Sequence, residues 1–423
     1  MLERAVLVSV VQPQTKAAEL EFDREEFAAL AQAAGAEILG HFECRLRAPN
    51  AATLIGSGKV EEIAEFVRDE DVQIALFNAE ITPSQERNLE KRLCCRVIGR
   101  TGVILDIFAQ RAKTYEGRLQ VELAQLEHLS TRLVRGWTHL ERQRGGIGVR
   151  GPGESQLETD RRLLGRRVSQ LRSKLERIAN SREVGRRSRS VSPQPLIALI
   201  GYTNAGKSTL FNAVSGSVQQ AQDALFVTLD AKLKRIRTLS GLDAVMVDTV
   251  GFVSNLPHEL IDAFAATLEE TRQADVLLHV LDASSPHCGA MRDSVAEVLE
   301  RIGADDVPQL LVHNKIDRIG EAPRIEYRPD GPAASVWLSA GSGLGLDLLD
   351  EALRSLLQRD WVRRSIRLRP GCGEVRAWLY AQNAVKSEAL GEDGLLRLDV
   401  RLSRRNWNQF ERLCEKSRAH SAS

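Results

Sequence analysis

Apolar and polar positions follow two different rhythms along the first 180 residues, and each rhythm predicts a different architecture. Up to about residue 110, short β-rich runs alternate with helical stretches, which indicates βαβ units and a parallel sheet. The strands are predicted at 5–11, 36–47, 72–77 and 96–99, and the helices at 25–35, 59–67 and 83–93. We therefore expect an N-terminal parallel α/β domain at residues 1–110.

From about residue 117 to 181 the apolar positions recur at spacings of three and four, as in helices that pair along one stripe. Two such helices with a short connection predict an antiparallel coiled-coil hairpin at residues 111–181. The stretch Ser155–Glu158 has the pattern of a capping box and predicts the start of the second helix. The stripe positions are Leu119, Leu123, Leu126, Ser130, Leu133, Trp137 and Leu140, then Leu157, Arg161, Leu164, Val168, Leu171, Leu175 and Ile178.

The connection between the two helices, residues 142–153, holds five glycines and three arginines. An exposed tip of this composition suits close approach to an irregular RNA surface, with arginines that contact phosphates and stack on bases. A flexible turn is the alternative, and we favour RNA because a bare turn needs far fewer residues. The candidate RNA contacts are Arg142, Arg144, Gly145, Gly146 and Arg150.

The remainder of the chain reads as a linker and two further domains. Residues 181–195 are polar and basic, as linkers are. A second α/β alternation at 195–360 predicts a mixed sheet with helices on both faces. Strand-like runs at 364–369 and 395–402 enclose a helix-like stretch at 374–386, which predicts a small α+β domain at 361–423.

Charge is distributed unevenly over the 423 residues. The net charge is +1, yet residues 132–189 carry 16 Lys and Arg against 6 Asp and Glu, a local charge of +10. Such asymmetry indicates a polyanionic partner for this segment, with a solvated helical face as the alternative. The six cysteines show no C-x-x-C spacing, the amino terminus is a poor signal peptide, and no apolar stretch approaches the ~20 residues that span a bilayer. We expect a cytosolic, monomeric protein without a membrane span.

The strongest local motif is Gly201–Ser208, which matches G-x-x-x-x-G-K-[ST] between an apolar run at 195–200 and a helix-like stretch at 209–214. Strand, glycine turn and helix start form the context of a phosphate-binding loop, in which backbone N–H groups and the helix N-terminus face the phosphates. Lys207 is then expected to reach the β- and γ-phosphates, and the Ser208 hydroxyl to bind Mg²⁺. The alternative is a chance glycine turn.

Further motifs follow in the order that a GTPase requires. Asp248 ends an apolar strand and can hold the Mg²⁺ shell, while the Gly251 N–H can meet the γ-phosphate. Thr228 can add a second hydroxyl to Mg²⁺. Asp317, after another strand, can accept both N–H donors of guanine, and Ser339–Gly341 can offer a backbone N–H to its carbonyl. Each motif alone is weak, but five in order at strand ends indicate a guanine-nucleotide site.

The expected roles cover three groups of residues. Lys207, Thr228 and Gly251 are the catalytic candidates, and Ser208, Thr228 and Asp248 the Mg²⁺ ligands. The predicted GTP contacts are Gly201, Tyr202, Thr203, Asn204, Ala205, Gly206, Lys207, Ser208, Phe226, Val227, Thr228, Leu229, Asp230, Asp248, Thr249, Val250, Gly251, Asn314, Lys315, Ile316, Asp317, Ser339, Ala340 and Gly341.

The motif set, the glycine-rich hairpin tip and the stretch Gly251–His258 together resemble the HflX family of bacterial ribosome-associated GTPases. The resemblance covers about residues 5–360, is most specific at 144–160 and 248–270, and is looser over the last sixty residues. It implies binding to the large ribosomal subunit, with the hairpin directed toward the peptidyl-transferase centre, and splitting of stalled ribosomes. It also suggests an ATP-related activity in the N-terminal part.

Three features of the sequence allow more than one interpretation. Gly56–Lys59 is half of a phosphate-loop pattern, and a turn with a helix cap is its simpler interpretation. Phe252 stands where many GTPases carry a water-orienting glutamine, so we expect slow basal hydrolysis and a partner that supplies the missing group. Asn204 either binds a monovalent cation or, as we favour, braces the loop. The alternative functions are a GTP-switched regulatory module and an RNA-remodelling ATPase.

Overall fold

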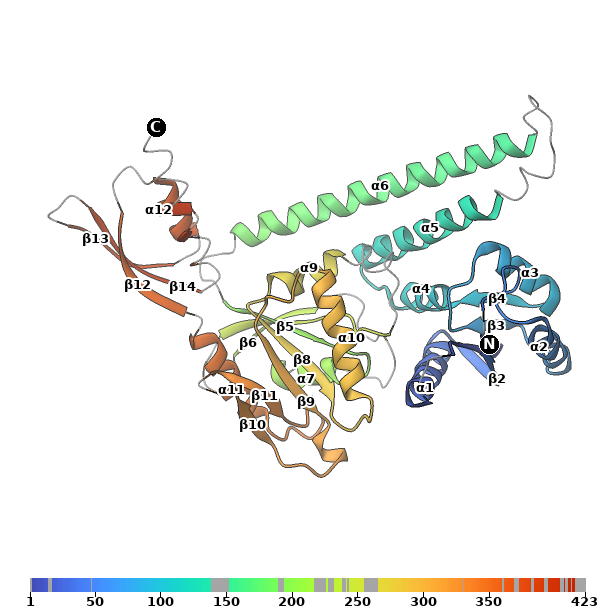
Figure 1. Cartoon of the computed structure of the whole chain (residues 1–423). Helices are drawn as coiled ribbons and strands as arrows, with labels where there is room; N and C mark the ends of the chain where they lie inside the picture. Colours follow the sequence, from blue (N-terminus) through green and yellow to red (C-terminus); the bar gives the residue numbers. More distant parts are fainter. Residues whose placement is uncertain are drawn as a thin grey trace.

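Figure 1 shows the structure, a computed structural model of the whole chain, as a ribbon. The residues that it describes are 2–13, 17–46, 48–137, 152–188, 194–216, 226, 232–237, 241, 243–254, 265–329, 331–359, 361–368, 373–381, 384–391, 395–403, 407, 410–411 and 413–414.

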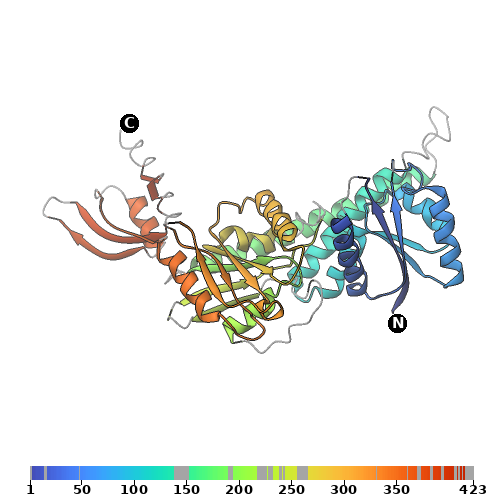
Figure 2. The ribbon, with the colours of Figure 1, turned by 60° about the horizontal axis from the view of Figure 1, so that its bottom comes forward.

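The N-terminal domain is a four-stranded sheet in the order β2-β1-β3-β4, and every pairing is parallel, as predicted. Helices α1 and α4 pack on one face of the sheet and α2 and α3 on the other (Figure 2). Helix α4 was not among the predicted elements. The elements are β1 (Glu3–Val11), α1 (Ala17–Ala33), β2 (Ala36–Arg45), α2 (Ser57–Asp69), β3 (Ile74–Phe77), α3 (Pro83–Leu93), β4 (Arg96–Gly99) and α4 (Arg100–Arg111).

Two long helices, α5 (Tyr115–Trp137) and α6 (Pro152–Ser188), run antiparallel to each other as the predicted hairpin (Figure 1). Leu119 and Leu123 of α5 are buried with Leu171 of α6, which confirms the apolar stripe at these positions. The tip at residues 142–151 lies outside the described residues. Within the described part of the chain, no helix combines the length and the apolar character that crossing a membrane requires.

Two predictions about α6 are wrong. The helix begins at Pro152, so Ser155 lies inside it and cannot be its N-cap; proline is well suited to a first helical turn because its missing N–H is not needed there. The helix also continues to Ser188, into the stretch predicted to be a linker.

The third unit is a seven-stranded mixed sheet in the order β10-β11-β9-β8-β5-β7-β6. Its edge strands β10 and β6 are antiparallel to their neighbours, and the inner pairings are parallel. Helices α7 and α11 cover one face and α10 the other, as predicted. The elements are β5 (Leu196–Gly201), α7 (Lys207–Ser215), β6 (Lys232–Arg237), β7 (Asp243–Asp248), α9 (Ala265–Gln273), β8 (Val276–Asp282), α10 (Cys288–Arg301), β9 (Gln309–Asn314), η2 (Ile316–Arg318), β10 (Arg324–Tyr327), β11 (Ala333–Trp337) and α11 (Leu346–Arg359).

The C-terminal unit is a three-stranded antiparallel sheet with one helix, α12 (Gly373–Ala381), packed on it. Its strands are β12 (Trp361–Leu368), β13 (Val385–Leu390) and β14 (Leu396–Ser403), in the order β12-β14-β13. The α+β prediction is correct, but the predicted helix at 374–386 ends early. Residues from Val385 onward form β13 because they pair with β14.

Candidate functional site

The predicted motifs converge on one edge of the seven-stranded sheet, at the carboxyl ends of its parallel strands. Gly201–Ser208, the phosphate loop, begins at the last residue of β5, and Asp248 is the last residue of β7. Asn314 ends β9, and Ser339 follows β11. Carboxyl ends at such an edge are where α/β sheets bind ligands. Phe226 is described, whereas Val227, Thr228, Leu229 and Asp230 lie outside the described residues.

The phosphate loop has the backbone that its glycines predict. Gly206 has φ of 94°, and a Cβ there would lie 2.2 Å from Asn314 Nδ2, so only glycine fits. Helix α7 begins at Lys207, whose buried Nζ donates to the carbonyls of Gly201 (3.0 Å) and Tyr202 (2.6 Å). Burial lowers the pKa of Lys207 to about 8. The loop thus holds a buried ammonium group that an anion would stabilise.

Ser208 and Asp248, two of the predicted Mg²⁺ ligands, lie in direct contact. The Ser208 hydroxyl donates to Asp248 Oδ2 over 2.7 Å, and Asp248 is fully buried. One neutral and one anionic oxygen at the same point form a donor set that suits Mg²⁺, which prefers hard oxygen ligands. The residues present therefore fit this ion, while Thr228 lies outside the described residues.

A second loop, Asp248–Ser254, is tied to the phosphate loop by its backbone. Thr203 N donates to Phe252 O over 2.8 Å, and Phe252 N donates to Gly201 O over 3.2 Å. Between them, a Cβ at Gly251 would lie 2.7 Å from Thr203 Cγ2 and 3.1 Å from Lys207 Nζ. The Gly251 backbone therefore approaches the Lys207 ammonium as closely as glycine alone permits, beside the expected position of the terminal phosphate.

Asn314 joins the two loops on the other side of the site. Its Nδ2 donates to Ala205 O in the phosphate loop, and its Oδ1 accepts from Ala340 N; both distances are 2.9 Å. The side chain is buried, so it acts as a brace between loops. The sequence placed Asn314 among the GTP contacts without indicating this bridging position.

The loop Asn314–Asp317, called here the Asn314 loop, buries Ile316 and exposes Asp317. Lys315 has φ of 65° and donates from Nζ to Asp282 Oδ2 over 2.6 Å. Burial raises the pKa of Asp282, but the hydrogen bonds from Lys315 and Ser284 outweigh burial and keep that pKa below its usual value. Asp317 is exposed, so its carboxylate can accept hydrogen bonds from a ligand. Asp282 belongs to none of the sequence motifs, and it lies 33 residues before its partner Lys315.

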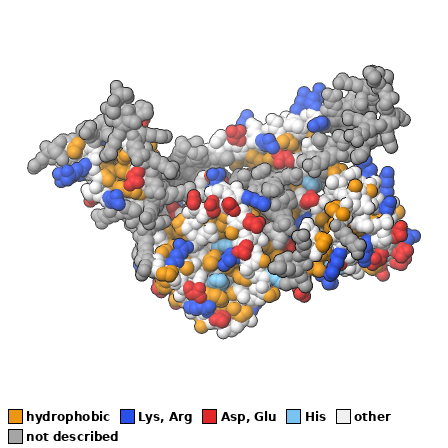
Figure 3. All heavy atoms as spheres, in the orientation of Figure 1, with side chains coloured by type: hydrophobic (Ala, Val, Ile, Leu, Met, Phe, Trp, Pro, Cys, Tyr) orange, Lys and Arg blue, Asp and Glu red, His pale blue; other side chains and the backbone are white. Residues whose placement is uncertain are grey.

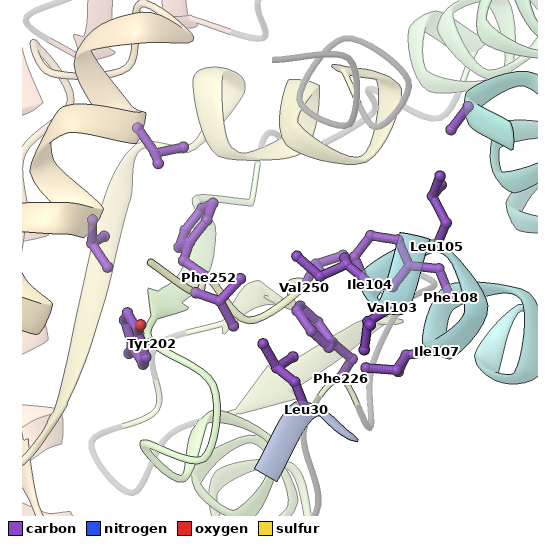
Figure 4. Close-up of a cluster of buried hydrophobic side chains, with 14 of the residues drawn as sticks. Leu30, Val103, Ile104, Leu105, Ile107, Phe108, Tyr202, Phe226, Val250 and Phe252 are labelled. Carbon is purple, nitrogen blue, oxygen red and sulfur yellow. The ribbon is translucent and has the colours of Figure 1, made fainter. Parts of the chain in front are cut away.

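Side chains of the Asp248 loop pack against the N-terminal domain. Val250, Phe252 and Tyr202 belong to one buried cluster with residues of α1 and α4, several of which Figure 4 labels. Phe226 joins the same cluster, and its ring meets Phe108 of α4 edge to face with centroids 4.7 Å apart. The Phe252 side chain is 3 % exposed. It is therefore committed to the domain contact and does not orient water.

A buried polar network lies in the same contact. Arg100 at the start of α4 forms an ion pair with Glu26 of α1, and both side chains are about 5 % exposed or less. Arg100 also donates to Ser254 O over 2.9 Å, and Ser254 N donates to Glu26 Oε1 over 3.2 Å. The Tyr202 hydroxyl of the phosphate loop donates to Glu26 and accepts from Ser254 N over 2.6 Å. Two residues of the N-terminal domain thus hold both nucleotide loops.

The other predicted sites have simpler surroundings. Helix α2 begins just after Gly56, its N-cap, and Lys59 forms an ion pair with Glu62 at 2.8 Å, which agrees with the turn-and-cap interpretation of this segment. Asn204 is exposed with φ of 60°, so its amide is open to a ligand. The candidate RNA contacts Arg142, Arg144, Gly145, Gly146 and Arg150 all lie outside the described residues.

The described part of the hairpin carries exposed basic side chains (Figure 3). Arg161, Arg162 and Arg166 of α6 are exposed. Arg167, in contrast, forms an ion pair with Glu122 of α5 at 2.6 Å, so part of its charge is neutralised within the hairpin.

Comparisons with known proteins agree with this site. Three family profiles match the chain in sequence: "GTP-binding GTPase N-terminal" at 21–109, "GTP-binding GTPase Middle Region" at 111–189 and "50S ribosome-binding GTPase" at 196–315. GTPase HflX of Escherichia coli (strain K12) is 49% identical over 418 residues, which cover 99% of this chain and 97% of that protein. GTPase HflX of Magnetococcus marinus is 41% identical over 392 residues, covering 92% and 90%.

These matches extend over nearly the whole chain, so they include the hairpin and the N-terminal domain as well as the nucleotide site. The GTPase domain binds GTP and hydrolyses it. The chain belongs to the HflX GTPase family.

Proposed function

We propose that this GTPase binds the large ribosomal subunit in its GTP state, splits stalled ribosomes, and is released when GTP is hydrolysed. The observation that carries the proposal is the basic hairpin that extends away from the nucleotide domain (Figure 1). Its segment 132–189 has a local charge of +10, which suits ribosomal RNA. The description "50S ribosome-binding GTPase" of the matching family supports the same partner. The protein acts as a cytosolic monomer in this proposal.

The residues of the site take the following roles. The backbone of the phosphate loop and Lys207 bind the phosphates, and Asp317 accepts from the guanine ring. Ser208, Asp248 and Thr228 hold Mg²⁺, which neutralises charge on the phosphate oxygens when it is bound. Gly251 N–H meets the γ-phosphate, and Asn204 is a candidate ligand for a monovalent cation.

Phe252 limits the rate at which the isolated protein hydrolyses GTP. Because its ring is buried in the domain contact, no side chain at this position orients the attacking water. Basal hydrolysis is then slow, and the large subunit supplies or positions the missing group. The proposal therefore includes marked stimulation of hydrolysis by large subunits.

The hairpin tip provides the test of the proposed function. Replacing Arg142, Arg144 and Arg150 by glutamine, or residues 142–151 by a short Gly-Ser turn, should abolish ribosome splitting measured by light scattering. GDP affinity and basal hydrolysis should stay at wild-type values, because the tip is remote in sequence from the nucleotide loops. Splitting at the wild-type rate by both variants would show that the tip is only a spacer. Equal hydrolysis with and without large subunits would contradict the role proposed for the partner.

The lowered pKa of Lys207 predicts that nucleotide binding depends on pH. Its pKa is about 8 in the empty site, and bound phosphates favour the ammonium form and raise that pKa. Above pH 8, GDP binding should therefore take up one proton, and the affinity should fall by about tenfold per pH unit. Calorimetry between pH 7 and 9 in two buffers of different ionisation enthalpy measures the proton. Lys207→Arg, which cannot lose its charge, should bind without this slope; proton-free binding by the wild type at pH 9 would contradict the assignment.

Replacing Asn314 should weaken GDP binding, because its side chain bonds to the loops on both sides of the site. Asn314→Ala leaves Ala205 O and Ala340 N without the partners seen here. A buried polar group without a hydrogen-bond partner costs about 1–3 kcal/mol, and water can replace part of each lost bond. GDP affinity should therefore fall roughly tenfold. Asn314→Asp keeps the acceptor for Ala340 N but sets a carboxylate oxygen against Ala205 O, so it should bind no better. Wild-type affinity in both variants would exclude the bracing role.

A further inference from the structure

Lys315 has a backbone conformation and a partner that the nucleotide motifs do not explain. Its φ of 65° lies in the left-handed region, which a residue other than glycine adopts at a cost and which recurs at functional sites. Its Nζ donates to Asp282 Oδ2 over 2.6 Å. Asp282 ends β8 directly opposite Asn314 at the end of β9, and these strands are neighbours in the sheet (Figure 1). The Lys315 side chain is therefore fixed at both ends, in a direction that Asp282 sets.

The carboxylate of Asp282 is itself held in place. Its Oδ1 accepts from Ser284 N over 3.0 Å and from Ser284 Oγ over 2.5 Å, while Oδ2 binds Lys315. Ala283 N donates to Asn314 O over 2.9 Å, so the turn after β8 is tied to the Asn314 loop by its backbone as well. The side chains of Lys315 and Asp282 are only 15 % and 17 % exposed, so water and salt screen this ion pair less than a surface pair. The contact has a fixed geometry that does not depend on a bound nucleotide.

The stem of Lys315 is close in the chain to the group proposed to recognise the base. Asp317 is two residues further along the same loop and is exposed. The four carbons of a lysine stem offer an apolar surface when the charged end is bound elsewhere. An aromatic ring gains from such a surface, and an ammonium near the ring face adds a cation–π attraction. A base whose edge meets Asp317 can therefore lie flat along the stem of Lys315.

We propose that Asp282 is a positioning residue of the base site: by binding Nζ, it holds the stem of Lys315 as the surface on which the guanine ring lies. The inference deepens the proposed nucleotide contacts, on which it rests, by adding the residue that orients Lys315. Asp282 touches neither base nor phosphate and acts through the lysine. Without its carboxylate, the lysine side chain would have to be ordered each time a base binds, and the affinity would fall by that cost.

The test is a double-mutant cycle on GDP binding by the full chain, measured by calorimetry. Asp282→Asn keeps an acceptor for Ser284 N and removes the charge that holds Lys315, and Lys315→Met keeps an apolar stem and removes the ammonium. Each variant should bind GDP roughly tenfold more weakly. The double variant should bind no more weakly than Lys315→Met, because both changes remove the same contact. Losses that multiply to about a hundredfold would overturn the inference.

Two comparisons separate positioning from a structural role. Asp293→Asn removes the same charge from an exposed ion pair of α10 and should bind GDP as the wild type does. Inorganic pyrophosphate carries no base, so its affinity, measured by competition with GDP, should be unchanged in Asp282→Asn. An equal loss for pyrophosphate and GDP would mean that the whole site is distorted and would overturn the inference.

A second variant at the same position keeps the test independent of how well Asp282→Asn folds. Asp282→Glu retains the charge but moves the carboxylate by one methylene, which displaces the lysine. It should also weaken GDP binding and should cause no further loss in the Lys315→Met background. Wild-type GDP affinity in both Asp282 variants would overturn the inference.

The proposed base contact is tested separately by Asp317→Asn. If this variant binds GDP as the wild type does while Asp282 and Lys315 are coupled in the cycle, the contact proposed for Asp317 fails and the inference about Asp282 stands. If Asp317→Asn loses GDP affinity and the cycle shows no coupling, the contact of Asp317 stands and the inference fails.

Discussion

Replacing Glu26 by alanine is expected to destabilise the contact between the N-terminal domain and the nucleotide loops by about 3–5 kcal/mol, the cost of leaving a buried charge without its partner. The charge in question is the Arg100 guanidinium, which is 4 % exposed as a residue. Its remaining hydrogen bond to Ser254 O cannot neutralise it. Calorimetric unfolding should show a lower midpoint for the transition that includes α1 and α4.

The neighbouring Glu25 provides a matched control, because it lies on the exposed side of the same helix. Glu25→Ala should change stability by no more than about 0.5 kcal/mol. Glu26→Leu/Arg100→Met removes both charges together and should recover most of the loss, since apolar residues can replace a buried ion pair. Equal midpoints for Glu26→Ala and Glu25→Ala would show that the pair is not buried in solution.

The same network links the domain contact to the nucleotide. Glu26 accepts from Tyr202 in the phosphate loop and from Ser254 in the Asp248 loop, so its loss acts on both loops. Tyr202→Phe keeps the ring in the apolar cluster and removes only the hydroxyl. GDP stabilises the folded chain according to its affinity. If the network sets the geometry of the loops, GDP should raise the unfolding midpoint of Tyr202→Phe by a different amount from that of the wild type.

The parts of the fold that were predictable have strong local patterns. The nucleotide motifs follow apolar β-rich runs, and these runs do form β5, β7, β9 and β11. Helix α4 was missed because most of its residues from Arg100 to Phe108 are buried, which removes the polar face that identifies an amphipathic helix. Strand β13 was missed because its residues take strand geometry from pairing with β14.

The polar network around Glu26 could not be predicted from the sequence, for a different reason. Glu26 and Arg100 are 74 residues apart, Glu26 and Tyr202 are 176, and Glu26 and Ser254 are 228. No periodicity or motif connects positions at such separations, and only the docking of the domains brings them together. Tyr202 is recognisable in the sequence as part of the phosphate loop, but nothing in that motif indicates that its hydroxyl reaches another domain.

Asp317→Asn is expected to exchange the base preference of the site from guanine to xanthine. The carboxylate accepts two N–H donors of guanine in the proposed complex, and hydrogen bonds to charged groups contribute about 1.5–3 kcal/mol each. Asparagine keeps one oxygen acceptor but turns its NH₂ toward the second donor, so at least one of these bonds is lost and GTP binding should weaken by roughly 10- to 10²-fold. Xanthine carries a carbonyl where guanine carries the amino group, so the asparagine NH₂ can donate to it and restore affinity for xanthosine triphosphate.

The exposed position of Asp317 allows base preference to be tested without destabilising the fold. Asp317 is exposed in the short helix η2, whereas the buried brace of the same loop is Asn314. The substitution at 317 should therefore leave the unfolding midpoint of the nucleotide-free chain unchanged, unlike Asn314→Ala. Competition between GTP and xanthosine triphosphate, measured for the wild type and the variant, gives the ratio of the two affinities directly. A variant that still prefers GTP would show that another group recognises the base, and the assignment of the Asn314 loop would have to be abandoned.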